Sequence, residues 1–406
     1  MRRPLDTTLS SSGSMESANQ TRAHSNNDSE RLGRSLEAHA CATEEQERLE
    51  RATAETGPGQ RMVICVDAGG TSCRAALMSA DGELASSVGG PCNVTTTALE
   101  LAMATVSQVV QAALDKHPAT RGQLIRTVTF SHVWVGMAGY DRPSLRPLID
   151  SALSEMFNLP LNQGLRVSTD IDLLPAVLSS TRDVNSAIVL VVGTGSVAMS
   201  YRREGKEFQR IGRVGGWGRI LGDDGSGYAT GREGIRRALR QCDLHRLRTS
   251  IGADPPPFPP LPMAILEHFQ AMYPGCDAGN LLSTLLVPPP AQDGEEDGDT
   301  TRTRNIASAA SVVLSLATND AEARRIVETG AASVAELVEM LVKEQAIDAA
   351  RCALVLGGGL MGDSTYRELV LRGIQNQCGV FGHVESVDQP AVAGARHLLD
   401  CNKNGL

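Results

Sequence analysis

Three aspartates and a set of glycine-rich turns are the residues of this 406-residue chain whose types and spacing could do chemistry. Asp67 ends an apolar run and directly precedes Gly69-Gly70-Thr71. Glycines allow close backbone approach, and successive N–H groups with nearby hydroxyls can surround an anion. A carboxylate at the mouth of such a turn could face the metal ion that accompanies a nucleotide. The pattern therefore predicts a phosphate-binding hairpin with Asp67 as a magnesium ligand.

A second turn of the same kind, Gly193-Thr194-Gly195-Ser196, again joins two apolar runs, at 187–192 and 196–201. Taken alone, it could be an ordinary hairpin turn. Because it repeats the strand, turn and strand of the first hairpin, phosphate contact is the favoured interpretation. Two such hairpins predict two facing domains that clasp one nucleotide.

The composition favours small-molecule partners. The net charge is −9 and the isoelectric point is about 5.5, so no basic field is present to hold nucleic acid or an anionic membrane surface. The nine cysteines show no C-x-x-C or Cys/His spacing, which argues for reduced thiols and against zinc or a disulfide framework. No apolar run approaches the roughly 20 residues of a membrane span, and the N-terminus lacks a secretory apolar region. We expect a cytoplasmic protein.

The chain divides into four predicted segments. Residues 1–59 are polar and poor in aromatics, which predicts a disordered tail. A first domain is expected over 60–182, and a second over 183–387 with proline-rich insertions near 254–262 and 287–300. A final helix within 388–406 is expected to pack back on the first domain.

Hydrophobic periodicity indicates an α/β protein. In the first domain it predicts a β-β-β-α-β-α-β order, with helices at 97–116 and 143–156 and strands at 128–136 and 165–169. In the second domain it predicts the two strands around the second turn, a glycine-rich loop over 212–227, helices, a strand at 353–356 and a helix from 365.

Five motifs in order resemble those of the N-acetylglucosamine kinases, which belong with the BadF/BadG/BcrA/BcrD-type ATPases in the sugar kinase, Hsp70 and actin superfamily. The resemblance spans about residues 61–402. The motifs are Asp67-Ala68-Gly69-Gly70-Thr71, Ser168-Thr169-Asp170, Gly193-Thr194-Gly195-Ser196, Gly215-Gly216-Trp217-Gly218 with Leu221-Gly222-Asp223-Asp224-Gly225-Ser226, and Leu356-Gly357-Gly358-Gly359.

The resemblance implies two ribonuclease H-like, actin-like ATPase domains, with ATP, Mg²⁺ and an amino sugar in the cleft between them. By motif position, Asp170 falls where the family keeps its catalytic base. The residues expected at ATP are Asp67, Gly69, Gly70, Thr71, Thr194, Gly195, Gly357, Gly358 and Gly359. The residues expected at the sugar are Asn93, Ser196, Val197, Gly216, Trp217, Gly218 and Asp223.

Each of the polar candidates also has a structural interpretation. Asp170 could be the N-cap of a helix over 173–177, and Asp141 could cap a helix that begins at Pro143. Trp217 could be a core side chain instead of a platform for a sugar ring. Asp223 with Asp224 could be a solvated acidic pair or a helix start, although we assign Asp223 to sugar binding.

Three departures from the family pattern concern the acceptor. Asp224 replaces a glutamate, Val214 stands where vertebrate members carry cysteine, and Ile171 with Asp172 replaces small residues after Asp170. We expect ATP-dependent phosphorylation of N-acetyl-D-glucosamine at its 6-hydroxyl, with an aspartate base. Alternatives are kinases of glucosamine or N-acetylmuramic acid, a dehydratase-activating ATPase with an iron–sulfur cluster, and a catalytically silent sugar sensor. A homodimer is left open.

Overall fold

A computed structural model describes residues 62–181, 183–286 and 298–403. They belong to one compact unit that starts at Arg61. The predictions for the tail 1–59 and for most of the proline-rich segment 287–300 lie outside the described residues. None of the helices in the three described ranges combines the length and apolar character that crossing a membrane requires.

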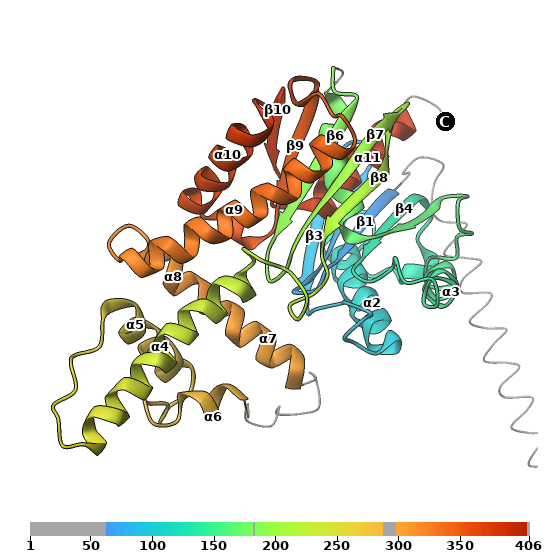
Figure 1. Cartoon of the computed structure of the whole chain (residues 1–406). Coiled ribbons are helices and arrows are strands. Elements are labelled where there is room, and N and C mark those ends of the chain that lie inside the picture. The colour runs from blue at the N-terminus through green and yellow to red at the C-terminus, as the bar shows by residue number, and fades with distance from the viewer. Residues whose placement is uncertain (1–61, 182, 287–297, 404–406) are drawn as a thin grey trace, which may run out of the picture. The chain divides into compact units, whose positions relative to one another are not determined.

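The first half of this unit is built on a five-stranded sheet (Figure 1). Its order is β3-β2-β1-β4-β5, in which β1 pairs antiparallel with β2 and parallel with β4. The strands are β1 (Met62–Ala68), β2 (Cys73–Ser79), β3 (Leu84–Gly89), β4 (Phe130–Met137) and β5 (Leu165–Ser168).

Both faces of the first sheet are covered, which is why β1 is buried at every residue and apolar except at Asp67. Successive side chains of β1 point to opposite faces of the sheet. Ile64 and Val66 belong to the core beneath helices α2 (Leu99–Lys116) and α3 (Arg146–Phe157). Val63 and Cys65 belong to a separate core on the opposite face.

A second five-stranded sheet repeats the arrangement of the first, in the order β10-β9-β6-β7-β8. Here β6 pairs antiparallel with β7 and parallel with β9, as β1 does with β2 and β4. The strands are β6 (Ser186–Val192), β7 (Ser196–Glu204), β8 (Glu207–Gly215), β9 (Cys352–Gly357) and β10 (His383–Ser386). The predicted α/β fold with two similar halves is therefore confirmed.

Two edge strands were not predicted. β8 occupies the start of the expected loop over 212–227, and β10 pairs only through a short parallel ladder with β9. In both, exposed and more buried residues alternate, and charged residues occur along each strand: Glu207, Arg210 and Arg213 in β8, and Glu385 in β10. Edge strands tolerate charged and glycine residues because one side of the strand is free of neighbours. Their apolar signal is correspondingly weak.

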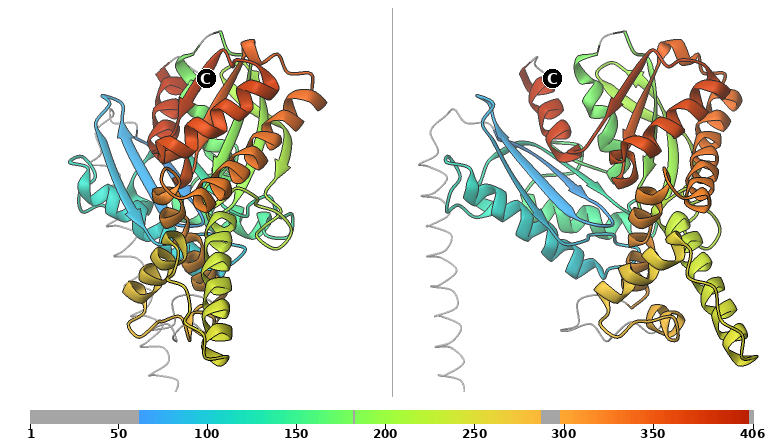
Figure 2. Two further views of the ribbon diagram at one scale, coloured as in Figure 1. Left: turned by 60° about the vertical axis from the view of Figure 1, so that its left-hand side comes forward. Right: turned by 90° about the vertical axis from the view of Figure 1, so that its left-hand side faces the viewer.

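The helices of the second half form two groups (Figures 1 and 2). Helix α9 (Ala321–Glu344) packs on the second sheet with α10 (Ser364–Cys378) beside it. Helix α4 (Gly227–Ser250) extends away from both sheets and contacts α5 (Pro260–Met272), α7 (Gly298–Ser308) and α8 (Ala310–Leu316). A short helix, α6 (Leu281–Leu286), contacts α7. Helix α5 begins inside the expected insertion 254–262, with proline in its first turn.

The connection between the halves is a 3₁₀ segment, η2 (Asp170–Ser180), wedged between the two sheets (Figure 2). Leu173 belongs to the core shared with Cys65 of β1, whereas Leu174 belongs to the core under the second sheet. Helix α11 (Pro390–Lys403) packs on η2 and on β1, β2 and β4. Consecutive side chains of η2 thus contact both halves.

Candidate active site

The carboxyl ends of three parallel strands bring polar residues into one row in the first half. Asp67 of β1 is the register partner of Gly136 of β4, and Gly136 is the partner of Ser168 of β5. Asp170 follows Ser168 by two residues at the start of η2. In open α/β sheets, ligands bind beyond the carboxyl ends of the strands. The row therefore places Asp67 and Asp170 at the edge of the sheet that is suited to a ligand.

The charge of Asp170 acts on Asp67. Burial, aided by the charge of Asp170 and opposed by Arg74, 3.7 Å away, raises the pKa of Asp67 to about 7. Burial also raises the pKa of Asp170 to about 6, against the N–H of Ile171, which lowers it. Carboxyl groups with pKa values near neutrality are suited to proton transfer or to holding a cation.

Asp170 is not the N-cap of η2. The cap is Thr169, whose backbone N–H and hydroxyl lie 3.1 and 2.8 Å from Asp172 Oδ2 in a capping box. The other carboxylate oxygen of Asp172 accepts a 2.8 Å hydrogen bond from the Tyr201 hydroxyl. The capping role that competed for Asp170 is thus performed by Thr169 together with Asp172, which the sequence indicated only as a departure from the family pattern.

The first glycine turn is closed by a 3.1 Å hydrogen bond from the Gly69 N–H to the Ser72 carbonyl, and leaves Gly70 and Thr71 exposed. A methyl group on Gly69 would stand 3.8 Å from Asp67 Oδ1, so the turn lies directly beside that carboxylate. Asn93 is next to the turn, with its amide nitrogen 3.8 Å from the position of a methyl group on Gly70. The structure thus groups these predicted residues with Asp67.

The second glycine turn is docked on the start of α4. The carbonyls of Gly193 and Thr194 accept hydrogen bonds of 2.8 and 3.2 Å from the N–H groups of Gly227 and Tyr228. Thr194 itself is exposed. The docking holds the turn beside the positive end of the α4 dipole, an environment that favours an anion.

The loop after β9 lies against the same turn. Gly358 has φ +92°, and a Cβ there would stand 2.5 Å from the carbonyl carbon and oxygen of Val192. Only glycine fits this position. Gly359 is exposed with open space around it. Gly357 is buried, and a Cβ there would stand 2.4 Å from Leu174 Cδ2, so this glycine packs on η2.

The side chain of Asp223 lies against the second glycine turn. Its carboxylate lies 2.9 Å from the position of a Cβ on Gly195, and the backbone N–H groups of Ser196 and Gly218 are directed at it. Burial nevertheless raises the pKa of Asp223. The Ser196 hydroxyl donates a 3.0 Å hydrogen bond to the carbonyl of Asp224, so Ser196 holds the loop in place.

Trp217 is not a core residue, because 67% of its surface is exposed. Its ring covers Gly222, with Cε3 3.2 Å from the position of a Cβ on that glycine. Ile220 and Leu221 on the same loop are also exposed. The loop thus presents an aromatic ring and two aliphatic side chains next to Asp223, a composition suited to a sugar ring.

An ion pair that sequence reasoning missed connects the two groups of residues. Arg213 Nη1 of β8 lies 2.6 Å from Asp141 Oδ2 of the first half. Asp141 contributes to raising the pKa of Asp170, and Arg213 opposes the rise at Asp223. Asp141 is not a helix cap, because α3 begins at Arg146 after Leu145 without a side-chain cap. In the sequence, Arg213 could have been identified as a site residue by its position just before Val214-Gly215-Gly216.

Comparison with known proteins gives one family and two curated relatives. Residues 64–396 match the BadF/BadG/BcrA/BcrD ATPase family. An N-acetyl-D-glucosamine kinase from Dictyostelium discoideum is 29% identical over 194 residues, or 47% of this chain and 58% of that one. An N-acetylmuramic acid/N-acetylglucosamine kinase from Clostridium acetobutylicum is 27% identical over 195 residues, or 48% and 58%. The chain thus spans little more than half the length of these relatives.

Solved structures share the fold. A candidate N-acetylglucosamine kinase from Chromobacterium violaceum aligns with a TM-score of 0.55 at 21% identity, covering 84% of this chain and 99% of that one. Another from Porphyromonas gingivalis aligns with a TM-score of 0.56 at 17% identity, with the same coverage. At these identities the likeness concerns the fold alone.

Proposed function

Because this chain belongs to the BadF/BadG/BcrA/BcrD ATPase family, we propose that it is an ATP-dependent kinase that phosphorylates N-acetyl-D-glucosamine at the 6-hydroxyl. The observation that carries the proposal is the pairing of Asp67 with Asp170 at the carboxyl ends of β1 and β5. Both curated relatives are named for activity on N-acetylglucosamine. Because N-acetylglucosamine is the acceptor in both names, we favour this sugar over glucosamine and N-acetylmuramic acid as the substrate.

Asp170 is the proposed general base. Its pKa of about 6 leaves the carboxylate mostly ionised at pH 7, yet basic enough to accept a proton from a hydroxyl. The capping role beside it belongs to Thr169 and Asp172, so the Asp170 side chain is available to a substrate. A positioned base of this kind contributes about 10²–10⁴-fold to the rate.

The two glycine turns are the proposed ATP contacts, with Thr71 and Thr194 at the phosphates and Gly358 with Gly359 near the adenosine. Asp67 fits a Mg²⁺ ligand, because burial and the charge of Asp170 disfavour its ionised form, and a divalent cation would relieve that penalty. When bound with ATP, Mg²⁺ neutralises charge on the phosphates.

Asp223 is the proposed ligand of sugar hydroxyls, and Trp217 the proposed platform for the sugar ring. Asn93 is proposed to contact the sugar from the first half, since its amide lies next to Gly70. Arg213 with Asp141 connects the two sides of this site through their 2.6 Å ion pair. Productive phosphoryl transfer depends on such positioning of acceptor and donor.

The test is ADP release from Mg-ATP in the presence of N-acetylglucosamine, glucosamine, N-acetylmuramic acid or glucose. We expect N-acetylglucosamine to give the highest kcat/KM, and its 6-deoxy analogue to give no turnover. Turnover of the 6-deoxy analogue would reject the 6-hydroxyl assignment. Absence of turnover with every sugar would reject the kinase proposal.

The dehydratase-activating alternative receives no support from the described residues. It requires cysteines that hold an iron–sulfur cluster between subunits. Of the eight cysteines in the described ranges, all but Cys378 and Cys401 are buried. Those two lie on different helices, α10 and α11.

A further inference from the structure

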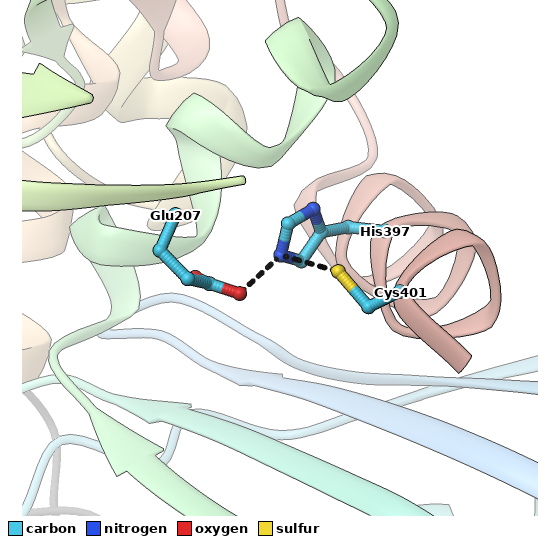
Figure 3. A group of neighbouring side chains, drawn as sticks. All are labelled: Glu207, His397 and Cys401. Carbon is cyan, nitrogen blue, oxygen red and sulfur yellow. Dashed lines mark hydrogen bonds and ion pairs between the residues drawn. The ribbon is translucent and has the colours of Figure 1, made fainter. Parts of the chain in front are cut away.

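A side-chain cluster outside the candidate active site groups a carboxylate, an imidazole and a thiol (Figure 3). Glu207 is the first residue of β8, and His397 and Cys401 lie one turn apart on α11. The ligand atoms of all three lie within 4.8 Å of one another. We propose that this cluster binds a transition metal ion of the zinc class between the two halves of the protein.

The distances are close to those of a metal centre. Tetrahedral zinc, with bonds of about 2.1 Å to nitrogen and 2.3 Å to sulfur, holds these two atoms about 3.6 Å apart. His397 Nε2 and Cys401 Sγ lie 3.7 Å apart. Nitrogen and carboxylate oxygen would lie about 3.4 Å apart, whereas His397 Nε2 and Glu207 Oε1 are 2.8 Å apart in a hydrogen bond. A small rotation of the partly exposed Glu207 side chain supplies the difference.

The donor set selects the class of ion. Thiolate and imidazole favour zinc and other late first-row metals, whereas magnesium and calcium favour oxygen ligands alone. Three protein ligands from Glu207, His397 and Cys401 leave a fourth tetrahedral position for water. The site is therefore chemically distinct from the proposed Mg²⁺ position at Asp67.

Neighbouring side chains orient the imidazole. His397 is 96% buried, and its Nδ1 lies 2.9 Å from the Ser179 hydroxyl, which directs Nε2 at Glu207 and Cys401. Histidines that bind metals commonly have such a partner on the second ring nitrogen. The Trp134 ring forms an apolar wall, with its centroid 5.8 Å from that of His397.

The charges of the cluster allow a divalent ion. Arg166 pairs with Oε2 of Glu207, which leaves Oε1 for the ion. A thiolate and a carboxylate balance the two positive charges of the metal, so the loaded site is neutral once the Cys401 thiol has released its proton to solvent.

The test is a titration of the full chain with Co²⁺, with no nucleotide present. We expect thiolate-to-cobalt charge-transfer absorption that saturates at one ion per chain and is displaced by Zn²⁺. Cys401→Ser should abolish this band, while Cys378→Ala, a partly buried cysteine on α10, should retain it. Ser179→Ala should weaken binding about 10- to 100-fold, because it removes the partner that orients His397.

Absence of the charge-transfer band in the folded wild type would overturn the proposal, as would a band that persists in Cys401→Ser. The cluster would then be a hydrogen-bonded contact between β8 and α11 only. His397→Gln provides a second variant that keeps a polar side chain, and it too should lose the band. Circular dichroism verifies that each variant is folded. None of these readouts depends on kinase activity.

Discussion

The two halves of the molecule have the same strand order but different chemistry at the carboxyl ends of their parallel strands. In the first sheet these ends bear Asp67 and Asp170, whose pKa values lie near neutrality. In the second sheet they bear Gly193 and Gly358, which pack against each other without side chains. The first half thus supplies charge, and the second supplies close backbone approach.

The two halves therefore use the same strand arrangement for two different tasks. Parallel strands of a sheet bring their carboxyl ends to one edge whatever the residues there. The residue types then decide whether that edge offers a carboxylate or an exposed backbone. Variants that exchange or remove these properties test the division.

The largest expected effect is on catalysis in the first half. Asp170→Asn should lower kcat by about 10²–10⁴-fold, because it removes the proposed base and keeps its shape. Asp172→Asn, in the same turn of η2, is the matched control. It should keep kcat near the wild-type value and lower the free energy of unfolding by about 1 kcal/mol through the capping box. Equal losses of kcat in the two variants would contradict the assignment.

The next effect tests the backbone contact in the second half. Gly358→Ala should lower the free energy of unfolding by about 2–4 kcal/mol, because it combines a positive φ with a clash against the Val192 carbonyl. Gly359→Ala meets open space and should cost much less. Urea denaturation measures both. If the two variants are equally stable, the loop does not lie on the second turn as described.

A third effect concerns the pH dependence of stability in the first half. A carboxyl whose folded pKa is raised stabilises the fold below its unfolded pKa, and that contribution is lost as pH rises through the folded value. For Asp67 the loss falls between about pH 4 and 8. Asp67→Asn should therefore be more stable than the wild type at pH 8, by up to about 4 kcal/mol, and equally stable at pH 4.

Thermal melting without nucleotide or metal measures this effect. Asp81 provides a control of opposite sign, because its hydrogen bonds with Ser79 and Glu83 lower its pKa. Asp81→Asn should give no gain of stability at pH 8. A gain for Asp81→Asn equal to that for Asp67→Asn would indicate a general effect of net charge instead of the burial of Asp67.

The smallest effect concerns the ion pair that joins the halves. Arg213 and Asp141 are both partly exposed, so a double-mutant cycle with Arg213→Gln and Asp141→Asn should give a coupling free energy below about 1 kcal/mol. Chemical denaturation of the four proteins measures it. A coupling above about 2 kcal/mol would mean that the pair holds the halves together more strongly than its exposure suggests.

The sequence by itself determined the α/β class, the family and the repetition of a hairpin made of strand, glycine turn and strand. These features are local: an apolar strand, a turn of glycines with hydroxyl residues and a second strand are contiguous in the chain. The edge strands β8 and β10 were missed for the same reason, because charged and other polar residues interrupt their apolar periodicity. Asp170 was found by its motif, but its position at the start of η2 left two interpretations.

Only the tertiary structure excluded the cap interpretation, by assigning the capping box to Thr169 and Asp172. In the folded protein Arg213 also pairs with Asp141, Trp217 is exposed, and Gly357 packs on η2. The cysteine spacing argued against zinc, and yet folding brings Glu207 to His397 and Cys401 across 190 residues of chain. Such contacts depend on how elements pack, which the local pattern of residue types does not encode.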